Sequence, residues 1–97
     1  MENNYYTYII KTVKNTLYCG ITNDILSRFK AHIEGKGAKY TRAFKPKEIV
    51  YLKEFENKSK ASKEEYRIKK TLSRIQKLDL IEENKIYTQK LINKIIK

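Results

Sequence analysis

The alternation of apolar and polar residues near the start of the chain predicts two short β-strands. Residues 6–13 divide between two faces, with Tyr6, Tyr8 and Ile10 on one and Thr7, Ile9 and Lys11 on the other. Residues 17–22 form the second predicted strand, and the segment between the strands is short enough only for a hairpin. Asn15 lies in this connection and is the residue there that best tolerates a left-handed turn.

A helix and a third strand are predicted next. The helix begins after a cap at Thr22 or Asn23 and ends at Gly35. Its apolar residues recur every four positions, at Ile25, Phe29 and Ile33. Residues 48–55 are rich in β-branched and aromatic side chains, which favours a strand.

The rest of the chain has helical spacing. A second helix is predicted from Ser59, and a third begins at a capping box formed by Ser73 and Gln76, with Ile75, Leu78 and Ile81 as its apolar stripe. We therefore expect an α+β fold, a three-stranded antiparallel sheet flanked by helices in the order β-β-α-β-α-α. We expect one domain over residues 1–83, with residues 84–97 as a basic amphipathic helix packed on it.

The charge of the chain points to a polyanionic partner. Lys and Arg number 22 against 11 acids, which gives a net charge of +11. Such an excess repels itself in a compact chain, so it favours nucleic acid as a partner first and an anionic membrane surface second. A lysine-rich genome bias is an alternative explanation of the same composition.

Cysteine and hydrophobic content exclude several classes of protein. The single cysteine, Cys19, cannot form an intramolecular disulfide, and with the single histidine, His32, it cannot supply a four-ligand zinc site. The N-terminal residues are unlike a signal peptide, and the longest apolar run is too short to span a bilayer. We expect a cytoplasmic protein without stable membrane association.

A basic loop is predicted over residues 36–47. It holds five cations, two aromatic residues and no acid: Lys36, Lys39, Arg42, Lys45 and Lys47, with Tyr40 and Phe44. Cations follow a phosphate backbone and aromatic rings stack on bases, so this composition predicts a nucleic-acid contact. An ordinary solvated basic loop is the alternative.

One carboxylate, Glu65, lies within the otherwise apolar stripe of the second helix, which also contains Ala61, Ile68 and Leu72. Burial of an unpaired carboxylate is unfavourable, so Glu65 is expected to have a cationic partner. A divalent metal ion is one candidate, because Mg²⁺ prefers hard oxygen ligands. Two alternatives remain, namely a capping box that begins at Ser62 and an ion pair with a nearby lysine.

Arg28 and His32 lie four residues apart and share one face of the first helix. The guanidinium fork of an arginine matches two phosphate oxygens, and a histidine can move a proton near neutral pH. Ordinary surface positions are the alternative for both. The chain also contains eight tyrosines, of which four cluster in the hairpin. Taken singly, these tyrosines are best explained by packing.

Together, in this order, the motifs resemble those of the GIY-YIG nucleases. Residues 6–8 and 18–20 are similar to the two signature tripeptides, with Tyr8, Tyr18 and Gly20 retained. Arg28 and His32 follow as in the family's helix, and residues 35–42 are similar to the loop of its small stand-alone bacterial members. Glu65, with Ile68 and Lys69 after it, resembles the metal-binding glutamate and its surroundings. The departures are Tyr6 for a signature glycine, Cys19 for a signature isoleucine, and Ile21 where excision-repair relatives carry a lysine.

The resemblance implies a metal-dependent endonuclease that hydrolyses DNA phosphodiester bonds with selectivity for structure or strand. Tyr18 would act as the base that activates water, or orient that base, and Tyr8 would assist it. Arg28 would stabilise the phosphoryl group, His32 would support the phosphate or a proton transfer, and Glu65 would hold one Mg²⁺ or Mn²⁺ ion. The nucleic-acid contacts would come from the basic loop and Lys69. The alternative is a binding module of the same fold with weak or no turnover.

A shared active site sets a condition on the hairpin. Tyr8 and Tyr18 lie on the same face only if the connecting loop has an odd number of residues, since paired residue numbers have a constant sum. A three-residue loop at 13–15 places Tyr8 opposite Gly20. The third residue of such a loop adopts a positive φ, so we predict this conformation for Asn15.

Overall fold

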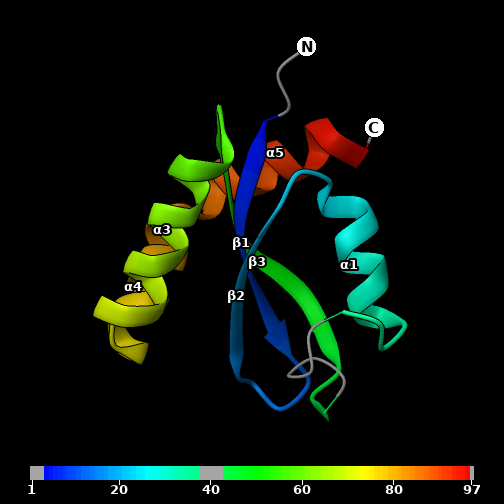
Figure 1. The fold of residues 1–97 in the computed structure, drawn as a ribbon. Coiled ribbons are helices and arrows are strands. Elements are labelled where there is room, and N and C mark those ends of the chain that lie inside the picture. Colours follow the sequence, from blue (N-terminus) through cyan, green and yellow to red (C-terminus); the bar gives the residue numbers. More distant parts are fainter. Residues whose placement is uncertain (1–3, 38–42, 97) are drawn as a thin grey trace.

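The computed structural model describes residues 4–37 and 43–96 of the chain. A three-stranded antiparallel sheet lies at its centre, with the strand order β2-β1-β3. The strands are β1 (Tyr5–Thr12), β2 (Leu17–Thr22) and β3 (Pro46–Phe55). The helices are α1 (Ile25–Ile33), α3 (Lys58–Thr71), α4 (Arg74–Glu83) and α5 (Lys85–Ile96). The predicted α+β class and element order are confirmed (Figure 1).

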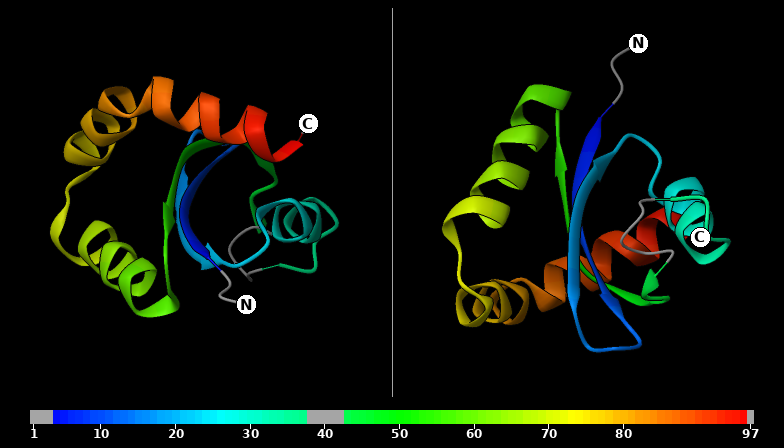
Figure 2. Two further views of the ribbon diagram at one scale, coloured as in Figure 1. Left: turned by 90° about the horizontal axis from the view of Figure 1, so that it is seen from above. Right: turned by 60° about the horizontal axis from the view of Figure 1, so that its bottom comes forward.

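The helices cover both faces of the sheet, so the central strand β1 is buried on both sides. One apolar cluster contains Tyr8, Ile10, Ile25, Leu52 and Leu91, which joins the sheet to α1 and α5. The other contains Ile9, Cys19, Tyr51 and Ile68, with α3 above it. Figure 2 shows α1 on one side of the sheet and α3 on the other, with α5 crossing beside β3.

The predicted helix starts need two corrections. The cap of α1 is Asp24, whose carboxylate accepts the Ser27 N–H at 3.1 Å, and not Thr22 or Asn23. Thr22 instead accepts the N–H of Asp24 in a tight turn. Helix α3 is capped by Asn57 and begins at Lys58, earlier than predicted. The capping-box explanation of Glu65 is therefore wrong, since that residue lies mid-helix.

The buried sides of α1 and α4 also differ from the predicted stripes. In α1 the buried residues are Ile25 and His32, whereas Ile33 is 56% exposed. In α4 the capping box of Ser73 and Gln76 is confirmed. Of the predicted stripe only Ile81 packs against the core, together with Leu80, whereas Ile75 and Leu78 are exposed, at 72% and 43%.

Helix α5 packs against the edge strand β3. Leu91 is buried in the same cluster as Tyr8, and Ile92 and Ile95 pack around it. The buried Thr88 hydroxyl accepts the Leu52 N–H at 3.2 Å, so the helix also satisfies a backbone donor on the outer side of the strand. Among the described residues, no helix is long and apolar enough to span a membrane.

Truncation of Leu91 tests the contribution of α5 to stability. We expect Leu91→Ala to lower the free energy of unfolding by about 2–5 kcal/mol, because it leaves a cavity in the core. Ile96→Ala, on the same helix but 57% exposed, should change it by less than about 0.5 kcal/mol. Urea unfolding followed by circular dichroism measures both. Equal effects of the two substitutions would show that α5 does not hold the core in solution.

Candidate active site

The β1–β2 hairpin has the predicted register. Asn15 has a φ of 66°, and the backbone N–H groups of Thr12 and Asn15 close the turn on the carbonyls of Thr16 and Thr12, each at 2.9 Å. Tyr8 therefore pairs with Gly20, and Ile10 with Tyr18. The two tyrosines are diagonal neighbours on one face, with ring centroids 6.4 Å apart.

Gly20 is required by the ring of Tyr8. A Cβ atom at Gly20 would lie 2.5 Å from the Tyr8 hydroxyl oxygen and 2.7 Å from the ring carbon that carries it. Both atoms belong to a side chain that is only 1% exposed, so the ring has little room to move away. The absence of a side chain on β2 thus sets the position of the phenol on β1.

Helix α1 brings Arg28 and His32 to the same two tyrosines. The Tyr8 hydroxyl and His32 Nε2 lie 3.0 Å apart, and the His32 ring meets the Tyr8 and Tyr18 rings edge-on at 5.9 and 5.3 Å. Helix α1 also places Arg28 close to both phenols, and its interactions with Tyr8 and Tyr18 raise the pKa of its guanidinium. Gly37 packs directly on the His32 ring, where any side chain would collide with Nδ1. Four of the predicted site residues thus form one cluster.

Burial keeps Tyr8 and His32 neutral at pH 7. It raises the pKa of Tyr8 to about 12, although the hydrogen bond from Arg28 opposes the rise. Burial also lowers the pKa of His32 to about 4, and the neighbouring positive charge of Arg28 adds to this shift. The pKa of Arg28 is raised, chiefly by its hydrogen bond to Tyr8. The positive charge of the four-residue cluster therefore belongs to Arg28.

Glu65 approaches the cluster from α3, on the other side of β2. Its carboxylate forms an ion pair with Lys69 at 3.1 Å, and the Lys69 ammonium lies 5.8 Å from the centroid of the Tyr18 ring. The predicted ion pair with a nearby lysine is therefore present. Lys69 thus places a cation from α3 beside Tyr18 on β2. On that same strand this chain has Ile21 at the position where excision-repair relatives carry a lysine. Within residues 4–37 and 43–96, no group of three or more His, Cys, Asp or Glu residues could hold a metal ion.

Only part of the predicted basic loop can be placed. Lys36 and Lys45 are exposed, and the carbonyl of Lys45 accepts the Val13 N–H at 2.9 Å, which joins the end of the loop to the hairpin. Lys39, Tyr40 and Arg42 lie outside the described residues.

Two features of the site were missed from the sequence. The burial of His32 could have been found from its position seven residues after Ile25, on the same helix face as that core residue. The contact of Gly37 with His32 has no comparable local signal, since the two residues meet only through the turn that ends α1. Both features act on the orientation of the imidazole.

A family model described as the GIY-YIG catalytic domain matches residues 4–79. The chain belongs to the GIY-YIG family. The resemblance found in the sequence motifs is thus confirmed, and the family places the chain in a nuclease superfamily that binds nucleic acid.

The GIY-YIG relatives of this chain are of similar length. UPF0213 protein OB0043 of Oceanobacillus iheyensis is 50% identical over 82 residues, which cover 84% of this chain and 94% of the relative. UPF0213 protein CPE1444 of Clostridium perfringens is 51% identical over 81 residues, covering 84% and 86%. The solution NMR structure of UPF0213 protein BH0048 from Bacillus halodurans matches with a TM-score of 0.56 and 39% identity, covering 84% of this chain and 86% of that one. These three names state no activity.

The lowered pKa of His32 predicts a pH-dependent stability. The unfolded chain takes up a proton on this histidine near its ordinary pKa of about 6.5, whereas the folded chain does so only near 4. Stability conferred by the neutral imidazole is therefore complete above about pH 6.5 and is lost as the pH falls toward 4.

We expect the free energy of unfolding to fall by about 2 kcal/mol between about pH 7 and about pH 5 through this group. Urea unfolding at a series of pH values measures it, with His32→Gln as the control that removes the titrating group. If the variant loses as much stability over this range as the wild type does, other groups cause the effect.

Proposed function

We propose that this GIY-YIG protein is a metal-dependent endonuclease that hydrolyses the phosphodiester bonds of DNA, with selectivity for structure or strand. The observation that supports the proposal is the convergence of Tyr8, Tyr18, Arg28 and His32, contributed by two strands and one helix. Cleavage of a phosphodiester requires an activated nucleophile and donors aimed at the charge that develops on the phosphoryl oxygens. These four side chains provide groups of both kinds.

The two tyrosines have different surroundings, which suggests different roles. Tyr8 is 1% exposed, bonded to His32, and has a raised pKa of about 12, so it stays protonated at neutral pH. In our proposal Tyr8 is a positioning residue, since its hydroxyl donates to neutral His32 while it accepts from Arg28. Tyr18 is only partly buried and stands on an edge strand, so it is the phenol that can reach a water molecule.

Arg28 is the group proposed to bind the scissile phosphate. Its side chain is partly exposed and interacts with both phenols, so the guanidinium stands at the site before any substrate arrives. A guanidinium has five donors, and its bonds to the tyrosines leave others for two phosphoryl oxygens. A pre-positioned cation of this kind needs little reorganisation as negative charge develops.

Glu65 is the residue proposed to hold the divalent ion. A single carboxylate fits Mg²⁺, which is usually bound by one or two carboxylates together with substrate phosphates and water. The ion pair with Lys69 is no obstacle, because both side chains are partly exposed, at 24% and 43%, and such pairs contribute only about 0.3–0.5 kcal/mol. Mg²⁺ or Mn²⁺ would supply charge neutralisation at the phosphate.

The alternative is a nucleic-acid-binding module of the same fold without turnover. The ion pair between Glu65 and Lys69 favours it, since it gives the carboxylate a partner without a metal ion. Against it stands the arrangement around Tyr8, where Gly20, Arg28 and His32 all constrain one phenol. Binding of a phosphate backbone needs no such constraint.

Substitution of Glu65 separates the two functions. We expect Glu65→Gln to abolish Mg²⁺- or Mn²⁺-dependent cleavage of labelled DNA while binding of the same DNA is nearly unchanged, because only the carboxylate charge is removed. The matched control is Glu56→Gln, since Glu56 also pairs with the lysine four residues later, Lys60, at 3.1 Å. If the Glu65 variant cleaves DNA at the wild-type rate, Glu65 serves only as the salt-bridge partner of Lys69.

Removal of each phenol oxygen tests the division of roles. Tyr18→Phe should lower the rate of cleavage by about 10²–10⁴, the usual contribution of a general base. Tyr8→Phe should lower the free energy of unfolding as well as the rate. The loss of stability should be about 1–3 kcal/mol, because the buried Nε2 of His32 loses the Tyr8 hydroxyl as its hydrogen-bond partner. Single-turnover cleavage and urea unfolding of both variants give the comparison. A Tyr18→Phe enzyme with an unchanged rate would exclude that phenol as the base.

A further inference from the structure

A run of positive charge follows Glu65 along the chain. Residues 66–78 contain no acid and five cations: Arg67, Lys69, Lys70, Arg74 and Lys77. The run covers the end of α3 and the first half of α4, and the acids of α4 come only after it. Arg67 and Lys69 form ion pairs with Glu64 and Glu65. Lys69 stands beside Tyr18, and the excess positive charge of the run lies further along the chain, at Lys70, Arg74 and Lys77.

This segment is joined to the β1–β2 hairpin. Arg74 donates from Nη2 to the backbone carbonyl of Asn15 at 2.7 Å, which fixes the start of α4 against the turn. Lys77 lies three residues after Arg74 on α4, so the two cations share one side of that helix. The cations of α4 therefore lie beside the hairpin at one corner of the molecule.

A recess of about 280 Å³ opens at this corner. Two cations, Lys11 and Arg74, line it together with the aliphatic side chains of Leu17, Leu78 and Ile81. Its lining residues include no carboxylate. The recess thus combines an aliphatic floor with lining charges of one sign, and Glu48, which pairs with Lys11 in the strand register, lines the neighbouring recess.

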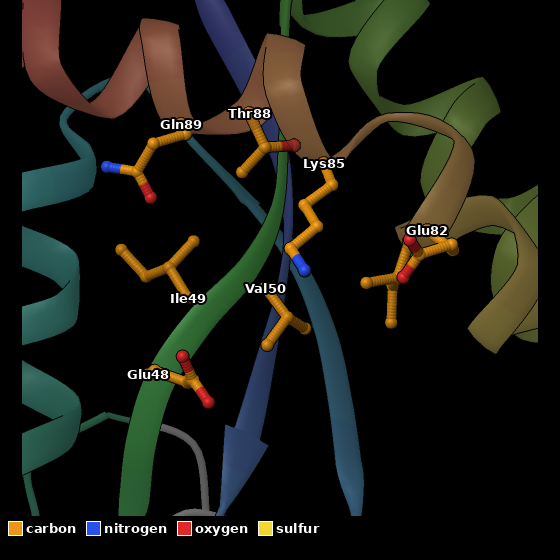
Figure 3. Close-up of a pocket in the computed structure, with 8 residues that line it drawn as sticks. Glu48, Ile49, Val50, Glu82, Lys85, Thr88 and Gln89 are labelled. Carbon is orange, nitrogen blue, oxygen red and sulfur yellow. The ribbon is translucent and has the colours of Figure 1, made fainter.

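Two other recesses of the described structure have mixed charge. One, of about 300 Å³, is lined by Glu48, Glu82 and Lys85 among others, and Figure 3 shows the Lys85 side chain extending into it with the two carboxylates on opposite sides. The other brings Glu54 together with Lys90 and Lys94. A carboxylate beside the cations disfavours a polyanion at both, so the corner at Arg74 is the one suited to phosphate.

We propose that Lys11, Arg74 and Lys77, here called the basic corner, bind the backbone of the nucleic acid whose scissile phosphate lies at Tyr18 and Arg28. The cations bind phosphate groups, and the aliphatic side chains of Leu17, Leu78 and Ile81 contact the sugars between the phosphates. This inference rests on the proposed function and extends it to the path of the substrate. Because the basic corner lies on the α3 side of the sheet and the tyrosines on the α1 side, the backbone crosses β2 at Lys69.

The test is the salt dependence of DNA binding. Affinity of a labelled oligonucleotide, single-stranded and duplex, is measured by fluorescence anisotropy in EDTA over a range of salt concentrations. The variant is Lys11→Gln with Lys77→Gln, which leaves the bond between Arg74 and Asn15 intact. The control is Lys90→Gln with Lys94→Gln on α5, which removes the same charge from the recess that contains Glu54.

We expect the corner variant to reduce the slope of log affinity against log salt by about 1.4 for a single strand or about 1.8 for a duplex, two phosphate contacts. The α5 control should leave the slope unchanged. Equal changes in both variants, or none in the corner variant, would overturn the proposal. If the wild type binds and cleaves DNA but the corner variant has the wild-type salt slope, the basic corner is wrong and the proposed function stands. If the wild type neither binds nor cleaves DNA, both the basic corner and the proposed function are wrong.

Substrate length gives a second readout that general electrostatics would not move. The effect of the corner variant on cleavage should disappear with oligonucleotides shortened on one side of the scissile bond, because these no longer reach the corner. Shortening on the other side should leave the effect in place. An effect that persists at every length would also count against the basic corner. Thermal unfolding of both double variants checks that each remains folded.

Discussion

The register of the β1–β2 hairpin is the constraint on which the candidate active site depends. Side chains alternate between the faces of a strand, so a shift of one residue would move Tyr18 to the opposite side of the sheet. The same shift would place a side chain, instead of Gly20, under the ring of Tyr8. One backbone conformation and two hydrogen bonds hold the register: the positive φ of Asn15, the bond between the hydroxyls of Thr12 and Thr16 at 2.6 Å, and the bond from Arg74 to the turn.

Much of the fold could be predicted because its signals are local. The strand pattern, the capping box of Ser73 and the parity of the hairpin each depend on a few neighbouring residues. On α1 the predicted positions Ile25 and Phe29 do face the core, but Ile33 does not, because apolar spacing ignores polar side chains that find a partner in the core. Ile33 was preferred to His32, yet the hydroxyl of Tyr8, which belongs to a different element, makes burial of the imidazole favourable.

The candidate site was predictable only as far as its motifs. The sequence motifs assigned Tyr18, Arg28 and Glu65 to one mechanism, but they did not predict on which side of β2 each side chain lies. The side depends on helix packing, which places α1 with Arg28 on one face of the sheet and α3 with Glu65 on the other. The stripe of α4 was only partly predicted for a related reason. The chain turns between α3 and α4, and this turn decides which side of the new helix meets the core, so that Leu80 is covered with Ile81 while Ile75 is exposed.

The position of α5 has a consequence for self-association. Edge strands are templates for pairing with another chain, and this sheet has two of them. At β3 the Thr88 hydroxyl already accepts the Leu52 N–H and α5 packs against the strand, so a second strand would have to displace this bond to pair there. Pairing of sheets between copies is thereby directed to β2, the strand that carries Tyr18. A dimer or aggregate formed by strand addition at β2 would lie against the strand that carries Tyr18. Self-association of this kind would therefore reduce access to the candidate active site.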